Sequence, residues 1–247
     1  MTKLSVNLNK VALLRNQRDV GYPNIIKTAE IILNAGAAGI TVHPRPDERH
    51  IRRSDIPELA QFIENHDNSE IEFNIEGYPA DDFIELVLKH KCHQVTLVPD
   101  EPNQRTSDHG WDVKKHHDML KDITKTLQSQ NRRVSLFLDP VPKLIEAVIS
   151  IGAKRIELYT GPYAEHQIDL MDYATTALEA KKNGIEVNAG HDLSLDNLGD
   201  FIESIPDCAE VSIGHAITSD ALLMGWDKAV KAYLEVIQKA QKKSGTV

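Results

Sequence analysis

Short segments in which apolar and polar residues alternate recur along the whole chain. In the first of them, residues 4–9, Leu, Val and Leu alternate with Ser, Asn and Asn. Alternation of this kind predicts a β-strand with one apolar and one polar face. The predicted strands are residues 4–9, 39–44, 71–76, 94–99, 134–139, 155–160, 185–190 and 210–215.

Between these strands lie segments whose apolar residues recur at the spacing of an amphipathic helix, such as residues 144–149. The longest predicted helix covers residues 222–237. Strands that alternate with helices form a parallel sheet, and eight such units predict a closed (β/α)8 TIM barrel, an α/β fold. Because 247 residues is a common length for one barrel, we expect a single domain over residues 1–247.

The polar faces of the strands predict a polar barrel interior. Parallel strands covered on both faces usually read as continuous apolar runs, so the apolar half of these strands must face the helices. A buried polar group without a partner costs about 1 to 3 kcal/mol, so the lumen groups must bond one another, water or a ligand. The expected lumen set is Asn7, His43, Glu72, Glu76, Asp139, Glu157 and Asn188.

Depth in the barrel separates two expected roles for these groups. Ligands of such barrels bind at the carboxyl ends of the strands, where His43 and Glu76 lie. Glu72 and Asn74 lie deeper, so we expect them to form a hydrogen-bonded polar core.

A basic loop follows the second predicted strand. Two prolines, Pro44 and Pro46, end the strand, and the loop then carries two imidazole-bearing and four guanidinium-bearing positions between residues 43 and 53. A rigid strand that displays such groups favours an anion site, although a solvated basic loop is the alternative. Residues 100–111 form a second long polar loop, which is typical of an active-site lid or of a surface loop.

Two Gly-His pairs end the last two predicted strands, at Gly190 and at Gly214. Glycine lets the backbone approach a ligand closely, and the following helix N-termini offer free N–H groups, as phosphate sites of barrels do. The general acids and bases expected nearby are His43, His50, His191, His215, Glu76 and Glu157.

This inventory fits proton transfer on a carbonyl compound, and two other chemistries stay open. His43, His191 and His215 with a glutamate could hold a divalent metal, although no His-x-His or His-Glu-x-x-His spacing supports it. Lys10 is the lysine placed for a Schiff base.

The amino-acid composition limits the classes of partner that the protein can be expected to bind. A net charge of −9 argues against a nucleic-acid surface, whereas residues 1–53 carry nine Lys and Arg against four Asp and Glu, which suits a small anionic substrate. No run of 18 apolar residues is present, and the chain enters a strand pattern at once, so we expect a cytoplasmic protein that binds no membrane. Cys92 and Cys208 form no Cys-x-x-Cys pair and predict neither a disulfide nor a zinc site.

Seven motifs spread over nearly the whole chain belong together. They are Val-Asn-Leu-Asn-Lys with Leu-Arg-Asn-Gln-Arg in residues 6–18, Gly-Ile-Thr-Val-His with Arg-His-Ile in 39–51, Asn-Ile-Glu in 74–76, Val-Ser-Leu-Phe-Leu-Asp in 134–139, Ile-Glu-Leu-Tyr-Thr-Gly in 156–161, Val-Asn-Ala-Gly-His in 187–191, and Ile-Gly-His-Ala-Ile in 213–217. In these motifs the sequence resembles the pyridoxine 5'-phosphate synthase family.

The resemblance implies condensation of 1-deoxyxylulose 5-phosphate with 3-amino-2-oxopropyl phosphate to pyridoxine 5'-phosphate, phosphate and water. It implies no metal and no cofactor, and it implies a homo-oligomer, an octamer in the family. The matching catalytic residues are His43 as general base, Glu76 as general acid/base, His191 as general acid and Glu157 as stabiliser of cationic character. The matching sugar-phosphate contacts are Arg18, Arg45, His50 and Thr106, and the aminoketone contacts are Asn7, Gly214 and His215.

Three further substrate-binding positions depart from the family pattern. Asn9 and Lys10 stand where many members have Asp-His, and a lysine can reach a phosphate as a point charge. Asp192 stands where glycine is frequent, and its charge would suit a phosphate site only if the side chain caps the next helix. The alternatives to this synthase are a metal-dependent carbon–carbon lyase on the same barrel and a phosphosugar-binding regulatory module.

Overall fold

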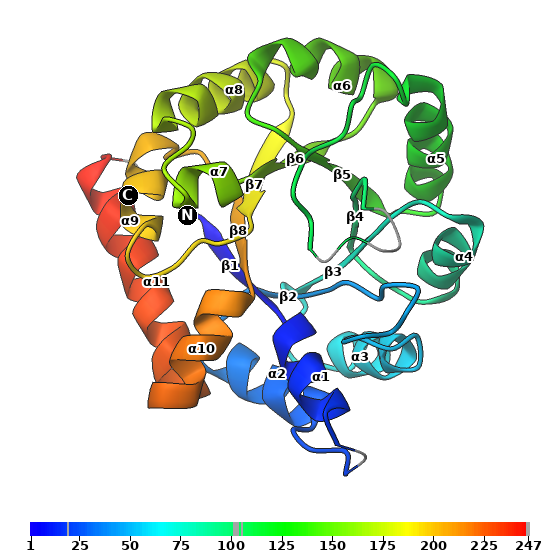
Figure 1. Ribbon diagram of the computed structural model, residues 1–247, viewed down its shortest axis with the longest axis vertical. Coiled ribbons are helices and arrows are strands. Elements are labelled where there is room, and N and C mark those ends of the chain that lie inside the picture. Colours follow the sequence, from blue (N-terminus) through cyan, green and yellow to red (C-terminus); the bar gives the residue numbers. More distant parts are fainter. Residues whose placement is uncertain (19, 101–103, 105, 246–247) are drawn as a thin grey trace.

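The computed structural model confirms the predicted barrel: eight parallel strands close in the order β1 to β8, and helices surround them (Figure 1). The structure describes residues 1–18, 20–100, 104 and 106–245. The strands are β1 (Lys3–Asn7), β2 (Gly39–Val42), β3 (Glu72–Gly77), β4 (Gln94–Leu97), β5 (Arg133–Leu138), β6 (Arg155–Tyr159), β7 (Glu186–Gly190) and β8 (Glu210–Ile213).

Helices follow every strand, and several strands are followed by two. Short helices such as α1 and α7 begin directly beyond the strand ends, at the end of the barrel where the predicted site residues lie. In the described chain the helices are α1 (Asn9–Asn16), α2 (Ile25–Asn34), α3 (Asp55–Glu64), α4 (Asp81–Lys89), α5 (His117–Ser129), the 3-10 turn η1 (Pro142–Leu144), α6 (Ile145–Ile151), α7 (Gly161–Ala164), α8 (Leu170–Lys182), α9 (Leu198–Ser204), α10 (His215–Met224) and α11 (Trp226–Lys243).

The predicted last helix is two helices. Gly225 has a φ of 84°, in the left-handed region, and it ends α10 before α11 begins at Trp226. The apolar spacing of residues 222–237 runs through this break without a gap, so the periodicity alone could not reveal it. Leu222 and Leu223 lie exposed near the end of α10 and do not form part of the buried face of one long helix.

The predicted division of apolar and polar faces is confirmed by bonds that cross the lumen. Asn7 of β1 bonds Glu76 of β3, and Thr96 of β4 bonds Glu157 of β6. Strands that are not neighbours can only meet through the interior of a barrel, so these side chains face the lumen. The alternating apolar residues, such as Leu4 and Val6, are fully buried against the helices.

An ion-pair layer fills the deep end of the lumen. Both Arg133 of β5 and Arg155 of β6 pair with Glu72 of β3, and Arg155 also donates to Gln94 Oε1 at 2.9 Å. Burial alone would raise the pKa of Glu72, but the Arg133 hydrogen bond and the two guanidinium charges lower it. These contacts agree with the structural role expected of Glu72.

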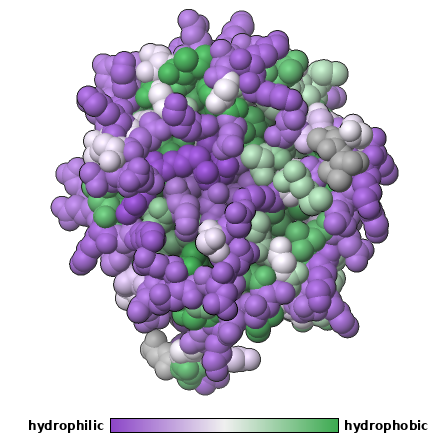
Figure 2. Space-filling view, turned by 180° about the vertical axis from the view of Figure 1, so that it is seen from behind, coloured by the Kyte–Doolittle hydropathy of each residue, from purple (hydrophilic) through white to green (hydrophobic). Residues whose placement is uncertain are grey.

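The surface opposite the face drawn in Figure 1 is mostly hydrophilic, with smaller and separate apolar areas (Figure 2). Within the described chain, no helix has both the length and the apolar character that crossing a membrane would require.

Candidate active site

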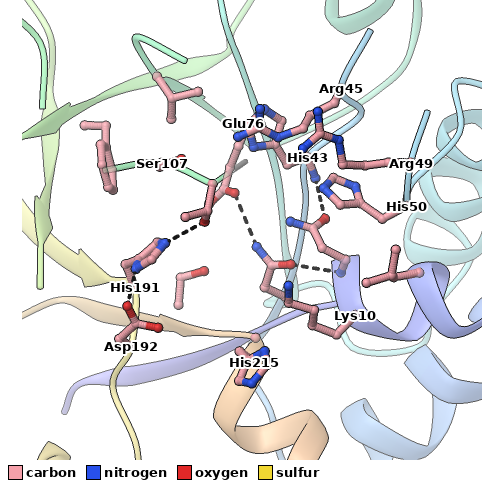
Figure 3. Close-up of a pocket in the computed structure, with 18 of the residues that line it drawn as sticks. Lys10, His43, Arg45, Arg49, His50, Glu76, Ser107, His191, Asp192 and His215 are labelled. Carbon is pink, nitrogen blue, oxygen red and sulfur yellow. Dashed lines mark hydrogen bonds and ion pairs between the residues drawn. The ribbon is translucent and has the colours of Figure 1, made fainter. Parts of the chain in front are cut away.

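A cavity of about 590 Å³ opens at the carboxyl ends of the strands. All the predicted site residues except Arg18 line it (Figure 3). The lining residues are Asn7, Asn9, Lys10, Leu13, His43, Arg45, Arg49, His50, Glu76, Val98, Thr106, Ser107, Phe137, Glu157, His191, Asp192, Ser212, Gly214 and His215.

Two asparagines connect the ends of the first three strands. The Asn7 side-chain amide donates a hydrogen bond to Glu76 Oε2 at 3.3 Å, and Asn7 Oδ1 accepts a hydrogen bond from the backbone N–H of Asn9 at 2.9 Å. Asn9 Oδ1 in turn accepts the backbone N–H of His43 at 2.9 Å. Asn9 therefore holds the end of β2 against α1, a structural contact that the sequence did not predict.

Two buried glutamates stand at the centre of the cavity with raised pKa values. Burial raises the pKa of Glu76 well above its ordinary value, and the charges of Glu157 and Asp100 add to this. Burial likewise raises the pKa of Glu157 to about 7, although Thr96, 3.4 Å away, and the His191 charge oppose the shift. Both carboxyls can hold a proton near neutral pH and release it, which is what acid/base catalysis requires.

One layer deeper, Glu210 of β8 carries a third such carboxyl. Burial and then the neighbouring charge of Glu72 raise its pKa to about 8. Asn188 donates to Glu210 Oε1 at 3.0 Å.

The two histidines of the second strand and its loop are held neutral. Burial lowers the pKa of His43 well below its ordinary value, and the nearby Arg45 and His50 add to the effect. Burial and Arg45 also lower the pKa of His50 to about 4, and its Nδ1 accepts the backbone N–H of Ile51 at 2.9 Å. A neutral imidazole accepts protons, so His43 is suited to the role of a general base.

The basic loop divides into residues that enter the cavity and residues that do not. Arg45, Arg49 and His50 line it, whereas Arg53 forms an ion pair with Asp82 on the outside. Arg45 is 4% exposed and pairs with the buried Asp100. The same guanidinium donates to the Gln104 carbonyl at 3.0 Å, so Arg45 ties the basic loop to the loop that follows β4.

On the opposite side, His191 is held at both ring nitrogens. Its Nδ1 lies 2.7 Å from Asp192 Oδ2, and its Nε2 lies 2.9 Å from Thr106 Oγ1 (Figure 3). The His191 hydrogen bond lowers the pKa of Asp192. The Asp192 carboxylate hydrogen-bonds this imidazole and caps no helix, so it orients the His191 ring. A φ of 58° at Asp192 lies in the left-handed region, where glycine is least strained.

Gly214 and His215 begin α10 at the end of β8. A Cβ on residue 214 would lie 3.1 Å from Cβ of Asn7, so glycine lets the Asn7 side chain pack closely against the backbone here. The N-terminus of α10 and the Lys10 ammonium of α1 both border this part of the cavity, and each favours an anion.

Arg18 lies exposed beyond the end of α1 and does not line the cavity.

The cavity has five lining residues that sequence reasoning did not single out: Leu13, Val98, Ser107, Phe137 and Ser212. Ser212 and Phe137 occupy the lumen register of their strands, so a complete count of alternate positions would have found them. Among the described residues, no three His, Cys, Asp or Glu side chains are grouped as a metal site requires.

Known proteins resemble this chain in sequence and in fold. The family model described as pyridoxal phosphate biosynthesis protein PdxJ matches residues 4–239. Proteins of Brucella anthropi and Brucella abortus, both called pyridoxine 5'-phosphate synthase, are each 48% identical over 244 residues, covering 95% of this chain and 98% of theirs.

Solved structures support the fold alone. A putative fructose-1,6-biphosphate aldolase from Coccidioides immitis has a TM-score of 0.67 at 9% identity and covers 100% of this chain and 94% of its own. The tryptophan synthase α subunit from Legionella pneumophila has a TM-score of 0.64 at 13% identity, with 98% and 93% covered. The barrel is thus shared widely, whereas the sequence match is specific, and the chain belongs to the PdxJ family of pyridoxal phosphate biosynthesis enzymes.

Proposed function

We propose that this enzyme condenses 1-deoxyxylulose 5-phosphate with 3-amino-2-oxopropyl phosphate to give pyridoxine 5'-phosphate, phosphate and water. The observation that carries the proposal is the cavity itself, in which two buried carboxyls with raised pKa values meet a neutral and a carboxylate-bound histidine. The 48% identity to proteins called pyridoxine 5'-phosphate synthase supports the same reaction.

The condensation needs groups that take and return protons at several carbons and oxygens. The amine of one substrate attacks the carbonyl of the other, so the imine forms between the substrates and requires no enzyme lysine. His43, neutral because of burial and Arg45, takes a proton as general base. Glu76, whose raised pKa lets it hold a proton, serves as acid and base in successive steps.

His191 protonates a leaving group, and Glu157 stabilises the positive charge that develops in the transition state. Asp192 beside Nδ1 orients the His191 ring, which acts as the general acid and donates a proton to a departing oxygen. Glu157 as a carboxylate stabilises cationic character in the transition state, and its pKa of about 7 places that form within the working pH range.

Two anion-binding regions of the cavity accommodate the two phosphates. Arg45, His50 and Thr106 contact the sugar phosphate. Arg18, which lies outside the cavity of this chain, is a proposed contact by family match alone. Asn7, Gly214 and His215 contact the aminoketone phosphate at the start of α10, where N–H groups face an anion. Lys10, Asn9 and Asp192 line the same cavity and complete the proposed substrate contacts.

The test is direct synthesis. Purified protein with both substrates should produce a new pyridine absorbance and free phosphate, and Glu76→Gln should slow the formation of both by ~100- to 10,000-fold at equal protein concentration. Absence of product with authentic substrates, from protein whose melting curve is cooperative, would overturn the proposal.

We also propose that the chain forms a closed homo-oligomer, an octamer by family match. Sedimentation of the purified protein should give a mass well above the 27.6 kDa of one chain. A stable monomer at working concentration would contradict it.

A further inference from the structure

A small apolar surface forms part of the cavity wall. Val98, Phe137 and Tyr159 pack together as a cluster separate from the main core and are 2%, 4% and 9% exposed. Val98 and Phe137 line the cavity directly, and the Phe137 and Tyr159 rings lie 5.4 Å apart. We call Val98 and Phe137 the apolar wall.

The apolar wall lies across the cavity from the phosphate-binding side. In a closed ring of eight strands, β4 is opposite β8 and β5 is opposite β1. Val98 follows β4 and Phe137 belongs to β5, whereas Gly214 follows β8 and Lys10 follows β1. The Lys10 charge acts on His50, one of the proposed sugar-phosphate contacts, so a sugar phosphate whose anionic end is held near Lys10 and His50 extends its other end towards the apolar wall.

The apolar wall adjoins the catalytic groups. Phe137 is the direct register partner of Glu157 on the neighbouring strand. Tyr159, behind the wall, packs edge-on against His191 with ring centroids 5.2 Å apart. A substrate group that contacts Val98 and Phe137 is therefore next to the proposed reacting carbons and not at a distant part of the substrate.

From this arrangement we propose that Val98 and Phe137 bind the methyl group of a methyl ketone and so select a 1-deoxy sugar phosphate over the same sugar with a C1 hydroxyl. The inference rests on the proposed function and adds a specificity determinant to it. The methyl group of 1-deoxyxylulose 5-phosphate is at the opposite end of the carbon chain from its phosphate, as the geometry requires. A hydroxyl at that place would leave water and lie against the apolar side chains of Val98 and Phe137.

The expected selectivity is moderate. Apolar pockets reject a substrate that merely adds a hydroxyl by about 100-fold, far less than a hydrogen-bonding site rejects a substrate that lacks its partner. We therefore expect the wild-type enzyme to prefer 1-deoxyxylulose 5-phosphate over xylulose 5-phosphate by ~10- to 100-fold in kcat/KM.

The decisive variant is Val98→Thr, which keeps the shape of the side chain and adds a hydroxyl to the apolar wall. The preference for the deoxy sugar should shrink by at least ~10-fold, with kcat/KM falling for the methyl ketone and rising for the hydroxymethyl ketone. The matched control is Leu13→Asn, which makes an equally polar change on α1 across the cavity and should leave the ratio between the two sugars unchanged.

The wild-type comparison already tests the proposal without any variant. Equal kcat/KM values for the two sugars, or a Val98→Thr ratio equal to that of wild type in a folded protein, would overturn it. Failure of the wild-type enzyme to form any pyridine product would instead overturn the proposed function. Binding of each sugar phosphate alone, measured by calorimetry, gives the same comparison with no chemical step.

Discussion

Gly190 of β7 lies so close to Glu157 of β6 that a Cβ on residue 190 would overlap Oε1 of the carboxyl. The glycine is not in the left-handed region, so alanine is conformationally allowed there and only the carboxyl must move. The Gly-His pair is therefore needed for the position of Glu157 as well as for the approach of a ligand.

Gly190→Ala should lower kcat by ~100-fold while the protein stays folded, because displacement of a catalytic group by about 1 Å has effects of that size. Turnover and thermal melts of the variant measure this. The control is Gly199→Ala in α9, where the added Cβ meets only Val236 Cγ1 at an ordinary 3.7 Å and turnover should persist. Full activity of Gly190→Ala would mean that the position of Glu157 is unimportant.

Two glutamates of β3 form a matched pair, about 13 Å apart on the same lumen face. Glu76→Gln keeps the shape but removes the transferable proton, so kcat should fall by ~100- to 10,000-fold with little change in melting temperature. Glu72→Gln weakens the pairs with Arg133 and Arg155, so the melting temperature should fall and kcat per folded molecule should change little. The reverse pattern would show that the catalytic assignment on this strand is misplaced.

Arg45→Ala should raise the KM for the sugar phosphate by ~10- to 150-fold and that for the aminoketone much less, because a charge-assisted hydrogen bond is lost. The variant also leaves the buried Asp100 without its partner, so stability should fall as well. Adding Asp100→Asn should recover stability without recovering the KM, which separates the two effects. Equal KM changes for both substrates would contradict the sugar-phosphate assignment.

Glu210 should make stability depend on pH. Its carboxyl has a pKa of about 8 when folded and 4.5 as its ordinary value, so the folded state keeps a proton that the unfolded state releases between these pH values. Stability attributable to Glu210 is therefore complete below pH 4.5 and is lost as the pH rises through about 8.

Glu210→Gln mimics the protonated form and should remove this loss. At pH 9 the variant should be more stable than wild type by ~2 to 5 kcal/mol, and near pH 4.5 the two should be equal. Denaturant unfolding at both pH values measures the difference, with Glu85→Gln on the exposed face of α4 as a control that should show no such gain. A gain of the same size at both pH values would mean that packing, not protonation, is responsible.

The fold could be predicted because alternation marks every strand of this barrel. The alternation of polar residues in β3 and β6 also predicted that Glu76 and Glu157 lie at the cavity. The prolines that end β2 predicted the loop that brings Arg45 to the same cavity. These are local signals, since a strand fixes the direction of each alternate side chain.

What could not be predicted depends on contacts distant in sequence or on single backbone angles. Nothing near Arg45 reveals that Asp100 pairs with it, and nothing near Leu222 reveals that Gly225 turns the chain. The apolar wall was missed for a different reason: Phe137 is an apolar residue in a lumen register, and the alternation rule looked there for polar residues only.

The pairing of β1 with β8 has a consequence for synthesis of the protein. Thr2 donates to the Cys208 carbonyl across a separation of 206 residues, and Gln241 of α11 donates to Thr2 at 2.9 Å. While the ribosome extends the chain, β1 and the newest strand are both open edges, and such edges pair readily with other chains. The barrel cannot protect its first strand until almost the last residues emerge, so a nascent chain halted before β8 should be prone to aggregation.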